Sequence, residues 1–322
     1  MTIKTKWQAC ILTVAFLTIM ACAPSMMVPV TRPAEINLRG NNKIAIGEIR
    51  GDGGQYIADL LTSKLFETGK FEIVDRANLD RIMKEHNLNI SGAVDEKTAA
   101  QLGKLVGAAV LVFGNLSTYK YDLSRAPGKP WTDGKGVSHT TYHVKGIAKV
   151  GLSIQVVGLT TGSILAAKTI SKEAAQENTE NDAWPPDPDS NALMGAAAHK
   201  TVDAFIKMIA PYTDYVDVTF AKNDSNVPEL ERGVNFAKAG QWADAVEQFK
   251  AAAEKNPTHQ GAFWNLGLAY EYSNSFEKAE EAFRTADKIK ICEKCIKEIG
   301  NVKRLAIERR KLDEQGALKA SN

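Results

Sequence analysis

Apolar and polar positions follow two alternating periods in the first half of the chain. Apolar residues recur at about every second position in Lys43–Ile49 (KIAIGEI), which is typical of a strand. After the turn GDGGQ, the segment YIADLLTSKLFETG repeats its apolar positions at helical spacing. The same order then returns, with FEIVD (Phe71–Asp75) as a strand and RANLDRIMKEHNL as a helix. The pattern therefore predicts repeated strand–helix units.

A third helix and a third strand complete this region. EKTAAQLGKLVG has helical spacing and ends at Gly107, and the segment AAVLVFGNL after it is apolar almost throughout. Such a run indicates a strand that is covered on both faces. Strands that alternate with helices favour right-handed crossovers and a helix-backed sheet. We therefore expect Lys43–Ser117 to form the central unit of the fold.

A long strand, a hairpin and a helix are expected next. From Thr140 to Val156 apolar side chains alternate with polar ones, over more residues than a strand usually contains. LTTGS (Leu159–Ser163) predicts the hairpin turn, ILAAKTISKEA a returning strand, and ALMGAAAHKTVDAFIKMI a helix that Pro211 stops. Three segments lack a period and are expected to be loops or connectors: Tyr119–Thr140, Asn178–Asn191 and YTDYVDVTFAKNDSNV.

The last third of the chain contains an internal repeat. Small and aromatic residues recur after 34 residues, which is the period of the tetratricopeptide repeat. The first set is Gly233, Phe236, Ala245, Phe249 and Ala252, and the second is Gly267, Tyr270, Ala279, Phe283 and Ala286. Glu293–Gln315 is amphipathic and is expected to cap the array, because two stacked repeats leave an apolar face uncovered.

The order of the N-terminal motifs resembles the curli secretion channel (CsgG) family of outer-membrane lipoproteins. The motifs are KIAIGEIRGDGGQY, LLTSKL, GKFEIVDRANLDRIMKEHNLNISG and AAQLGKLVGAAVLVFGNLS. The resemblance implies an α/β (α+β) domain with a helix-backed mixed sheet, followed here by an all-α tetratricopeptide-repeat domain. It also implies a role in the assembly or transport of surface or secreted material.

Composition excludes some other classes of protein. The chain has 322 residues and 44% hydrophobic content, which is enough for two domains that each have a core. A formal net charge of +2 argues against a nucleic-acid partner. No catalytic order of residues and no cofactor fingerprint occurs along the chain. We therefore expect no enzyme activity and no cofactor.

The N-terminus has the pattern of a bacterial lipoprotein signal. Two lysines precede an apolar run that ends at Met20, and Ala21 and Cys22 supply the small residue and the cysteine of the processing site. We expect Cys22 to carry lipid, because the apolar run is too short for the competing reading, a transmembrane anchor. Ala23 in place of Asp implies the outer membrane, on its periplasmic face.

The expected domain boundaries follow from these patterns. Residues 1–21 are a signal peptide, and 22–42, with three prolines and no period, are a lipidated flexible tether. In an extended form that tether would reach roughly 60 Å. Residues 43–211 form the CsgG-like α/β domain, 212–227 a linker, 228–291 two tetratricopeptide repeats, and 292–322 the capping helix and tail.

Three short motifs could carry chemistry, but each has a simpler explanation. The GDGGQ turn matches neither GxGxxG nor a Walker loop, which favours a turn alone. His139 and His143 share one side of a strand without a carboxylate near in sequence, so we expect solvated side chains and no metal. Cys292 and Cys295 have CxxC spacing with no second pair and no following His, which favours a disulfide or paired thiols over redox chemistry.

The repeats suggest a groove for a protein partner, since repeat grooves bind extended peptides or helices. By position in the repeat pattern, the groove side carries Leu230, Val234, Lys238, Trp264, Leu268, Glu271 and Tyr272. This apolar and aromatic face suits the anchor residues of a partner. The alternative is that the same residues pack on the first domain.

Members of the CsgG family assemble as rings that share a transmembrane pore, but this sequence departs from their pattern twice. Tyr56 leads directly into the first helix and leaves no room for a constriction loop. Lys172–Leu193, where a second spanning hairpin is expected, contains three prolines and several acids, so only the strand from Thr140 qualifies. We expect an accessory to a channel or a reduced channel. A homo-oligomeric secretion pore and a tethered regulator of the cell-wall synthase activator type are the alternatives.

Overall fold

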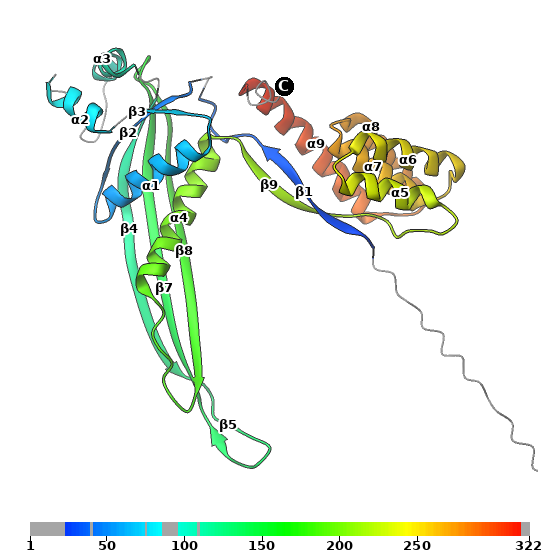
Figure 1. Cartoon of the computed structure of the whole chain (residues 1–322), viewed down its shortest axis with the longest axis horizontal. Helices are drawn as coiled ribbons and strands as arrows, with labels where there is room; N and C mark the ends of the chain where they lie inside the picture. Colours follow the sequence, from blue (N-terminus) through cyan, green and yellow to red (C-terminus); the bar gives the residue numbers. More distant parts are fainter. Residues whose placement is uncertain (1–22, 39–40, 75, 86–95, 108–109, 317–322) are drawn as a thin grey trace, which may run out of the picture. The chain divides into compact units, whose positions relative to one another are not determined.

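The computed structural model describes residues 23–38, 41–74, 76–85, 96–107 and 110–316 (Figure 1). The chain divides into two compact units. The repeat unit comprises Tyr215–Ile307 and the N-terminal segment through Val30, and the α/β unit comprises Thr31–Asp214 and the segment from Glu308 onward. Among the helices described, none has both the length and the apolar character that crossing a membrane requires.

A five-stranded mixed sheet forms the centre of the α/β unit (Figure 1). Its order is β3-β2-β4-β7-β8; β2 pairs in parallel with β3 and β4, while β4, β7 and β8 pair antiparallel. The strands are β2 (Lys43–Arg50), β3 (Glu72–Val74), β4 (Val110–Pro127), β7 (Thr141–Gly158) and β8 (Ile164–Asn181). The helix-backed mixed sheet predicted from the sequence is therefore confirmed.

Helices cover both faces of the sheet around its parallel strands. One face packs on α1 (Gly54–Glu67) and α4 (Ser190–Ile209), and the other on α2 (Arg76–Glu85) and α3 (Glu96–Val106). Successive residues of β4 alternate between these layers: Val110 and Val112 belong to the first core, and Leu111 and Phe113 to the second. Because both faces of β4 are covered at this end, its sequence is apolar at nearly every position.

The three antiparallel strands are longer than predicted, at 18 residues each. The loop prediction for Tyr119–Thr140 is wrong, because β4 continues to Pro127 and a small hairpin of β5 (Trp131–Thr132) and β6 (Ser138–His139) follows. β8 likewise runs to Asn181, into a segment expected to be turns. These distal halves are polar and exposed, so they have no apolar period. Backbone pairing with β7 fixes them instead.

Two helix pairs form the repeats, as predicted. They are α5 (Pro228–Lys238) with α6 (Trp242–Lys255), and α7 (Gln260–Tyr272) with α8 (Phe276–Ile289), followed by α9 (Glu293–Glu314). A Cβ at Gly233 would lie 2.4 Å from Cε1 of Phe249, and one at Gly267 would lie 2.5 Å from Cε1 of Phe283. Only glycine permits such a close approach of the paired helices.

A two-stranded ribbon joins β1 (Ser25–Arg32) to β9 (Tyr212–Thr219). The expectation of an extended tether over Ala23–Asn42 and of an irregular connector after Pro211 is therefore wrong. In β1, every second residue from Met26 to Val30 is apolar, and Val28, which is 3% exposed, lies in the core of the repeats. Pro29 obscures this period in the sequence, yet a proline is tolerated in an edge strand.

Candidate functional site

The predicted groove of the repeats holds a segment of the chain itself. The indole N–H of Trp264 donates to the carbonyl oxygen of Thr219 at 3.0 Å. Two residues later the N–H of Ala221 donates to Oδ1 of Asn265 at 2.7 Å, and Phe220 between them is 1% exposed. Side chains of α7 thus bind the backbone of Thr219–Ala221 in the way that a repeat groove binds an extended peptide.

Five of the seven predicted groove residues are consequently buried in the core of this unit: Leu230, Val234, Trp264, Leu268 and Glu271. Tyr272 is half-buried, with its ring centroid 5.1 Å from that of Trp242, and Lys238 is exposed. The prediction of an open groove is wrong, because the end of β9 and the residues after it fill the space. The apolar residues Val216, Val218 and Phe220 were the sequence signal for this packing.

Trp264 is also covered from α9. Nζ of Lys294 lies 4.0 Å from the centroid of the Trp264 ring, and the ring of Phe283 lies 5.2 Å away. Burial lowers the pKa of Lys294, whereas the indole face stabilises its charged form through a cation–π interaction. Because both the ring and the N–H of Trp264 have partners within the unit, this side chain stabilises the fold.

The two cysteines of the CxxC motif are joined by a disulfide at the start of α9. Their Cα atoms are 5.2 Å apart, and Cys292 and Cys295 are 6% and 0% exposed. The N–H of Cys292 donates to Oδ1 of Asp287 on α8 at 2.8 Å. Reactive cysteines need access to solvent, so this buried pair has the surroundings of a structural disulfide.

An apolar pocket of about 590 Å³ opens between α6, α7 and α8. Its floor includes Ala253, Leu266 and Ala282, each less than 10% exposed, together with the half-buried ring of Phe263. Charged side chains line its walls: Lys250 and Glu254 on α6, and Lys278 and Glu281 on α8. The sequence did not predict this pocket, because the repeat pattern predicts that the residues of its floor pack against neighbouring helices.

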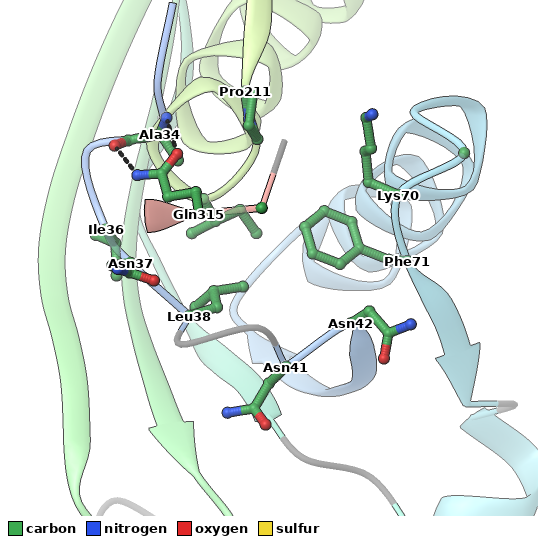
Figure 2. A pocket seen from close by; sticks show the side chains of 13 residues that line it. Ala34, Ile36, Asn37, Leu38, Asn41, Asn42, Lys70, Phe71, Pro211 and Gln315 are labelled. Atoms are coloured by element: carbon green, nitrogen blue, oxygen red, sulfur yellow. Dashed lines mark hydrogen bonds between the residues drawn. The ribbon is translucent and has the colours of Figure 1, made fainter. Parts of the chain in front are cut away.

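A second pocket, of about 400 Å³, lies among loops of the α/β unit (Figure 2). Gln315 closes one side of it through two hydrogen bonds with the backbone of Ala34. The N–H of Ala34 donates to Oε1 of Gln315 at 3.0 Å, and Nε2 of Gln315 donates to the carbonyl oxygen of Ala34 at 2.9 Å. The side chains of Leu38 and Phe71 give its interior an apolar character. Among the residues that the structure describes around this pocket, Lys70 carries the one titratable side chain, and no acid, histidine, serine or cysteine lies beside it to form a catalytic pair.

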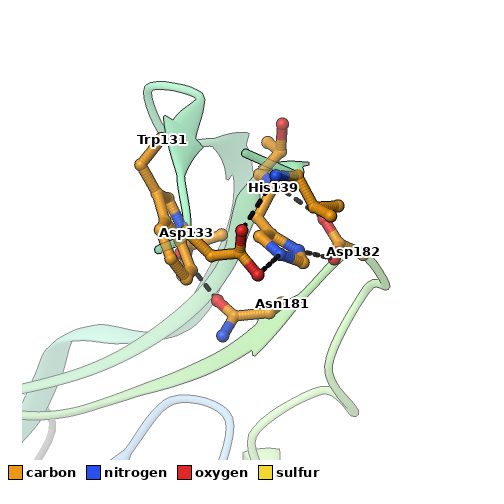
Figure 3. Close-up of polar contacts among 8 residues, drawn as sticks. Trp131, Asp133, His139, Asn181 and Asp182 are labelled. Carbon is orange, nitrogen blue, oxygen red and sulfur yellow. Dashed lines mark hydrogen bonds and ion pairs between the residues drawn. The ribbon is translucent and has the colours of Figure 1, made fainter. Parts of the chain in front are cut away.

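His139 lies between two carboxylates at the far end of the long strands (Figure 3). Its Nδ1 is 2.5 Å from Oδ2 of Asp182, and its Nε2 is 3.6 Å from Oδ2 of Asp133. Asp182 follows β8, and Asp133 belongs to the β5–β6 turn, so the imidazole links two segments. The ring of Trp131 lies 4.8 Å from the His139 ring, and its indole N–H donates to Oγ1 of Thr141 at 3.2 Å.

The pKa values of this group are shifted in opposite directions. The hydrogen bond with Asp182 raises the pKa of His139 above its ordinary value of 6.5. The same bond lowers the pKa of Asp182, and backbone N–H groups, first that of Val137, lower the pKa of Asp133. The expectation of no carboxylate near His139 in sequence is wrong, because Asp133 lies only six residues before it and faces its ring. Asp182 is 43 residues away along the chain, so the sequence did not reveal it. A second pair, His143 with Glu177, is 2.7 Å apart.

The remaining predicted sites are either turns or lie outside the described residues. In GDGGQ, Gly51 and Gly53 have φ values of 104° and 81°, which fits a turn that glycine makes possible. Across the described part of the chain, no cluster of three or more His, Cys, Asp or Glu side chains could hold a metal ion. Cys22, the predicted lipidation site, lies outside the described residues.

Comparisons with known proteins match both parts of the chain. Residues 39–184 match the family described as curli production assembly/transport component CsgG, and residues 230–290 match a tetratricopeptide-repeat family. These matches confirm the resemblance inferred from the motifs and the C-terminal repeat module. No curated protein matches the chain.

Solved structures that are similar to the chain include three bacterial proteins. The LpoB C-terminal domain from Salmonella enterica is 14% identical over 41% of this chain and 82% of that one, with a TM-score of 0.27. Lipoprotein GNA1162 from Neisseria meningitidis is 13% identical over 51% and 96%, with a TM-score of 0.30. The hypothetical protein CT253 from Chlamydia trachomatis is 8% identical over 52% and 94%, with a TM-score of 0.29.

Proposed function

Since residues 39–184 form a domain of the curli production assembly/transport component family and tetratricopeptide repeats follow it, we propose a role in export for this chain. It is a non-enzymatic lipoprotein of the bacterial envelope that acts in the assembly or transport of surface or secreted material. Lipid on Cys22 anchors it to the periplasmic face of the outer membrane, and the repeats bind a protein partner. The combination of these two domains in one chain carries the proposal.

The partner surface that we propose is the pocket between α6, α7 and α8, since the predicted groove is filled. Its volume of about 590 Å³ falls within the usual range for binding sites, roughly 300–1,000 Å³. Its apolar floor suits one or two apolar anchor side chains. Because each wall carries a lysine and a glutamate, the occupant is an amphipathic segment of a protein that has charges of both signs beside its anchors.

Deletion of the chain in its native host tests this role. We expect loss of secreted or surface-attached protein, restored by the wild type but not by Ala282→Trp, which fills the pocket. The control is Ala243→Trp, which adds the same side chain at an exposed position of α6. Thermal unfolding of both variants separates a filled pocket from a misfolded protein. Unchanged surface protein together with altered peptidoglycan crosslinking would replace the export role with that of a tethered cell-wall regulator.

A homo-oligomeric pore is the second candidate, and the edges of the sheet favour it. β8 is an edge strand along 18 residues, and the pairing of β2 with β4 ends at Asn115, so Thr118–Pro127 forms another edge. Within the described residues, no backbone hydrogen bond joins either edge to a further strand. Edges of this kind template pairing with a second chain. Ring particles in negative stain and single-channel conductance would establish this candidate, and a monomer without conductance would exclude it.

A further inference from the structure

We infer that the lipid anchor holds the repeat unit directly at the bilayer surface, and not at the end of a long tether. The interacting surface is the end of the repeat unit that carries Pro24 and Lys222, and its partner is the layer of lipid headgroups. This inference rests on the proposed lipidation of Cys22.

The first observation is that few residues separate Cys22 from a residue that is hydrogen-bonded to the repeat unit. The N–H of Phe220 donates to the carbonyl oxygen of Pro24 at 2.8 Å, and β1 begins at Ser25. Only Ala23 separates Pro24 from Cys22. A fully extended chain spans at most about 3.3–3.6 Å per residue, so the two intervening steps allow a separation of roughly 7 Å.

The second observation is that β1 is built into the core of the repeats. Val28 is 3% exposed and packs in one cluster with Val218, Phe220 and Leu230, while Met26 and Val30 pack against its border. β1 also pairs with β9, whose continuation occupies the groove beside Trp264. Release of β1 would expose these apolar side chains and break its hydrogen bonds with β9 and the bond from Phe220 to Pro24, so the folded chain keeps Pro24 at the repeat unit.

The position of the anchor determines which surface meets the lipid. Lys222 and Asn223 are exposed, and they follow Phe220, whose N–H donates to the carbonyl oxygen of Pro24, by only two and three residues. Polar and basic side chains are suited to contact with headgroup phosphates. A partner that binds the repeats would therefore meet them beside the membrane, where partners that are themselves membrane-associated are concentrated.

Energy transfer in vesicles tests this geometry. The full-length lipidated chain carries a fluorescent amino acid in place of Asn223, and the vesicles contain phosphatidylethanolamine and phosphatidylglycerol with a trace of acceptor-labelled lipid. We expect strong transfer, and loss of that transfer when a spacer of 20 Gly and Ser residues is inserted between Ala23 and Pro24. Such a spacer has a root-mean-square length on the order of 25 Å.

The control inserts the same spacer at Gly134, an exposed turn position where a Cβ would meet no atom within 4 Å. Transfer in this control should equal that of the parent protein. Equal transfer with and without the spacer before Pro24, in protein whose Cys22 is shown by mass spectrometry to carry lipid, would overturn the inference and leave the proposed lipoprotein function standing. Absence of lipid on Cys22 would overturn both.

Discussion

Two glycines set how closely the helices of each repeat approach. Gly233 and Gly267 face the rings of Phe249 and Phe283, and these aromatic residues are fully buried. The sequence predicted this arrangement correctly, because a glycine and an aromatic residue recur with the repeat period. A glycine and an aromatic ring must fit together in each repeat, so both residue types recur in the sequence at the 34-residue period.

Alanine at Gly267 should therefore destabilise the repeat unit. Its Cβ would lie 2.5 Å from Cε1 of Phe283, and overpacking of this kind costs about 1–3 kcal/mol of unfolding free energy. Urea denaturation measures the loss. Gly300→Ala is the control, because a Cβ there meets nothing within 4 Å and alanine favours the helix. Equal stability of Gly267→Ala and the wild type would refute the close approach.

Trp264 is expected to contribute through its N–H as well as through its ring. Trp264→Phe keeps an aromatic ring but removes the N–H that donates to the carbonyl oxygen of Thr219, and loss of one such hydrogen bond costs about 0.5–1.5 kcal/mol of unfolding free energy. The same substitution at the half-buried Trp242, whose indole N–H makes no hydrogen bond to the residues that the structure describes, should change the unfolding free energy by less than about 0.5 kcal/mol. Equal losses of unfolding free energy at both positions would show that the hydrogen bond to Thr219 does not stabilise the fold.

At the scale of elements, apolar pattern predicted the buried halves of the strands and missed the exposed ones. The start of β4 is apolar because helices cover both of its faces, but its continuation from Tyr119 to Pro127 is held by backbone bonds to β7. Backbone pairing leaves no mark in side-chain hydrophobicity, so the sequence predicted a loop there. β1 of the two-stranded ribbon was missed for a different reason, because Pro29 interrupts its alternation.

The β5–β6 hairpin should be held against β8 most strongly in mildly acidic solution. Protonated His139 is stabilised by Asp182 and Asp133, and its raised pKa means that the stabilisation is complete below pH 6.5 and is lost as the pH rises through that raised pKa. Below the ordinary carboxyl pKa of 3.8 the contact weakens again as Asp182, whose pKa is lowered, becomes protonated. Titration of the His139 ring by NMR should give a midpoint above 6.5.

Asp182→Asn provides the control for this titration. It removes the charge and the largest cause of the raised pKa, so the His139 midpoint should move down toward 6.5. The hydrogen bond between His143 and Glu177 should persist in this variant, since neither partner is changed. A His139 midpoint that stays the same when Asp182 is replaced would contradict the linkage between β8 and the hairpin.

At the scale of the whole molecule, the sequence predicted which domains the chain contains but not what occupies the repeats. The motifs identified the CsgG-like domain and the tetratricopeptide module, and both families match. The groove residues followed from the repeat pattern, which describes how an isolated repeat binds. That pattern contains no information about Thr219–Ala221, because the occupant belongs to a different segment of the same chain. The open pocket between α6, α7 and α8 depends on how the side chains of three helices pack, which the repeat pattern does not specify.

The measurement that tests the account most directly is the mass of the N-terminal peptide of the protein, recovered from the outer-membrane fraction of its native host. A lipoprotein of the export apparatus should begin at Cys22 and carry diacylglyceryl and acyl groups on that residue. A peptide that still begins at Met1, or an unmodified Cys22 in the soluble fraction, would contradict the anchored envelope role from which the export function and the membrane position of the repeats both follow.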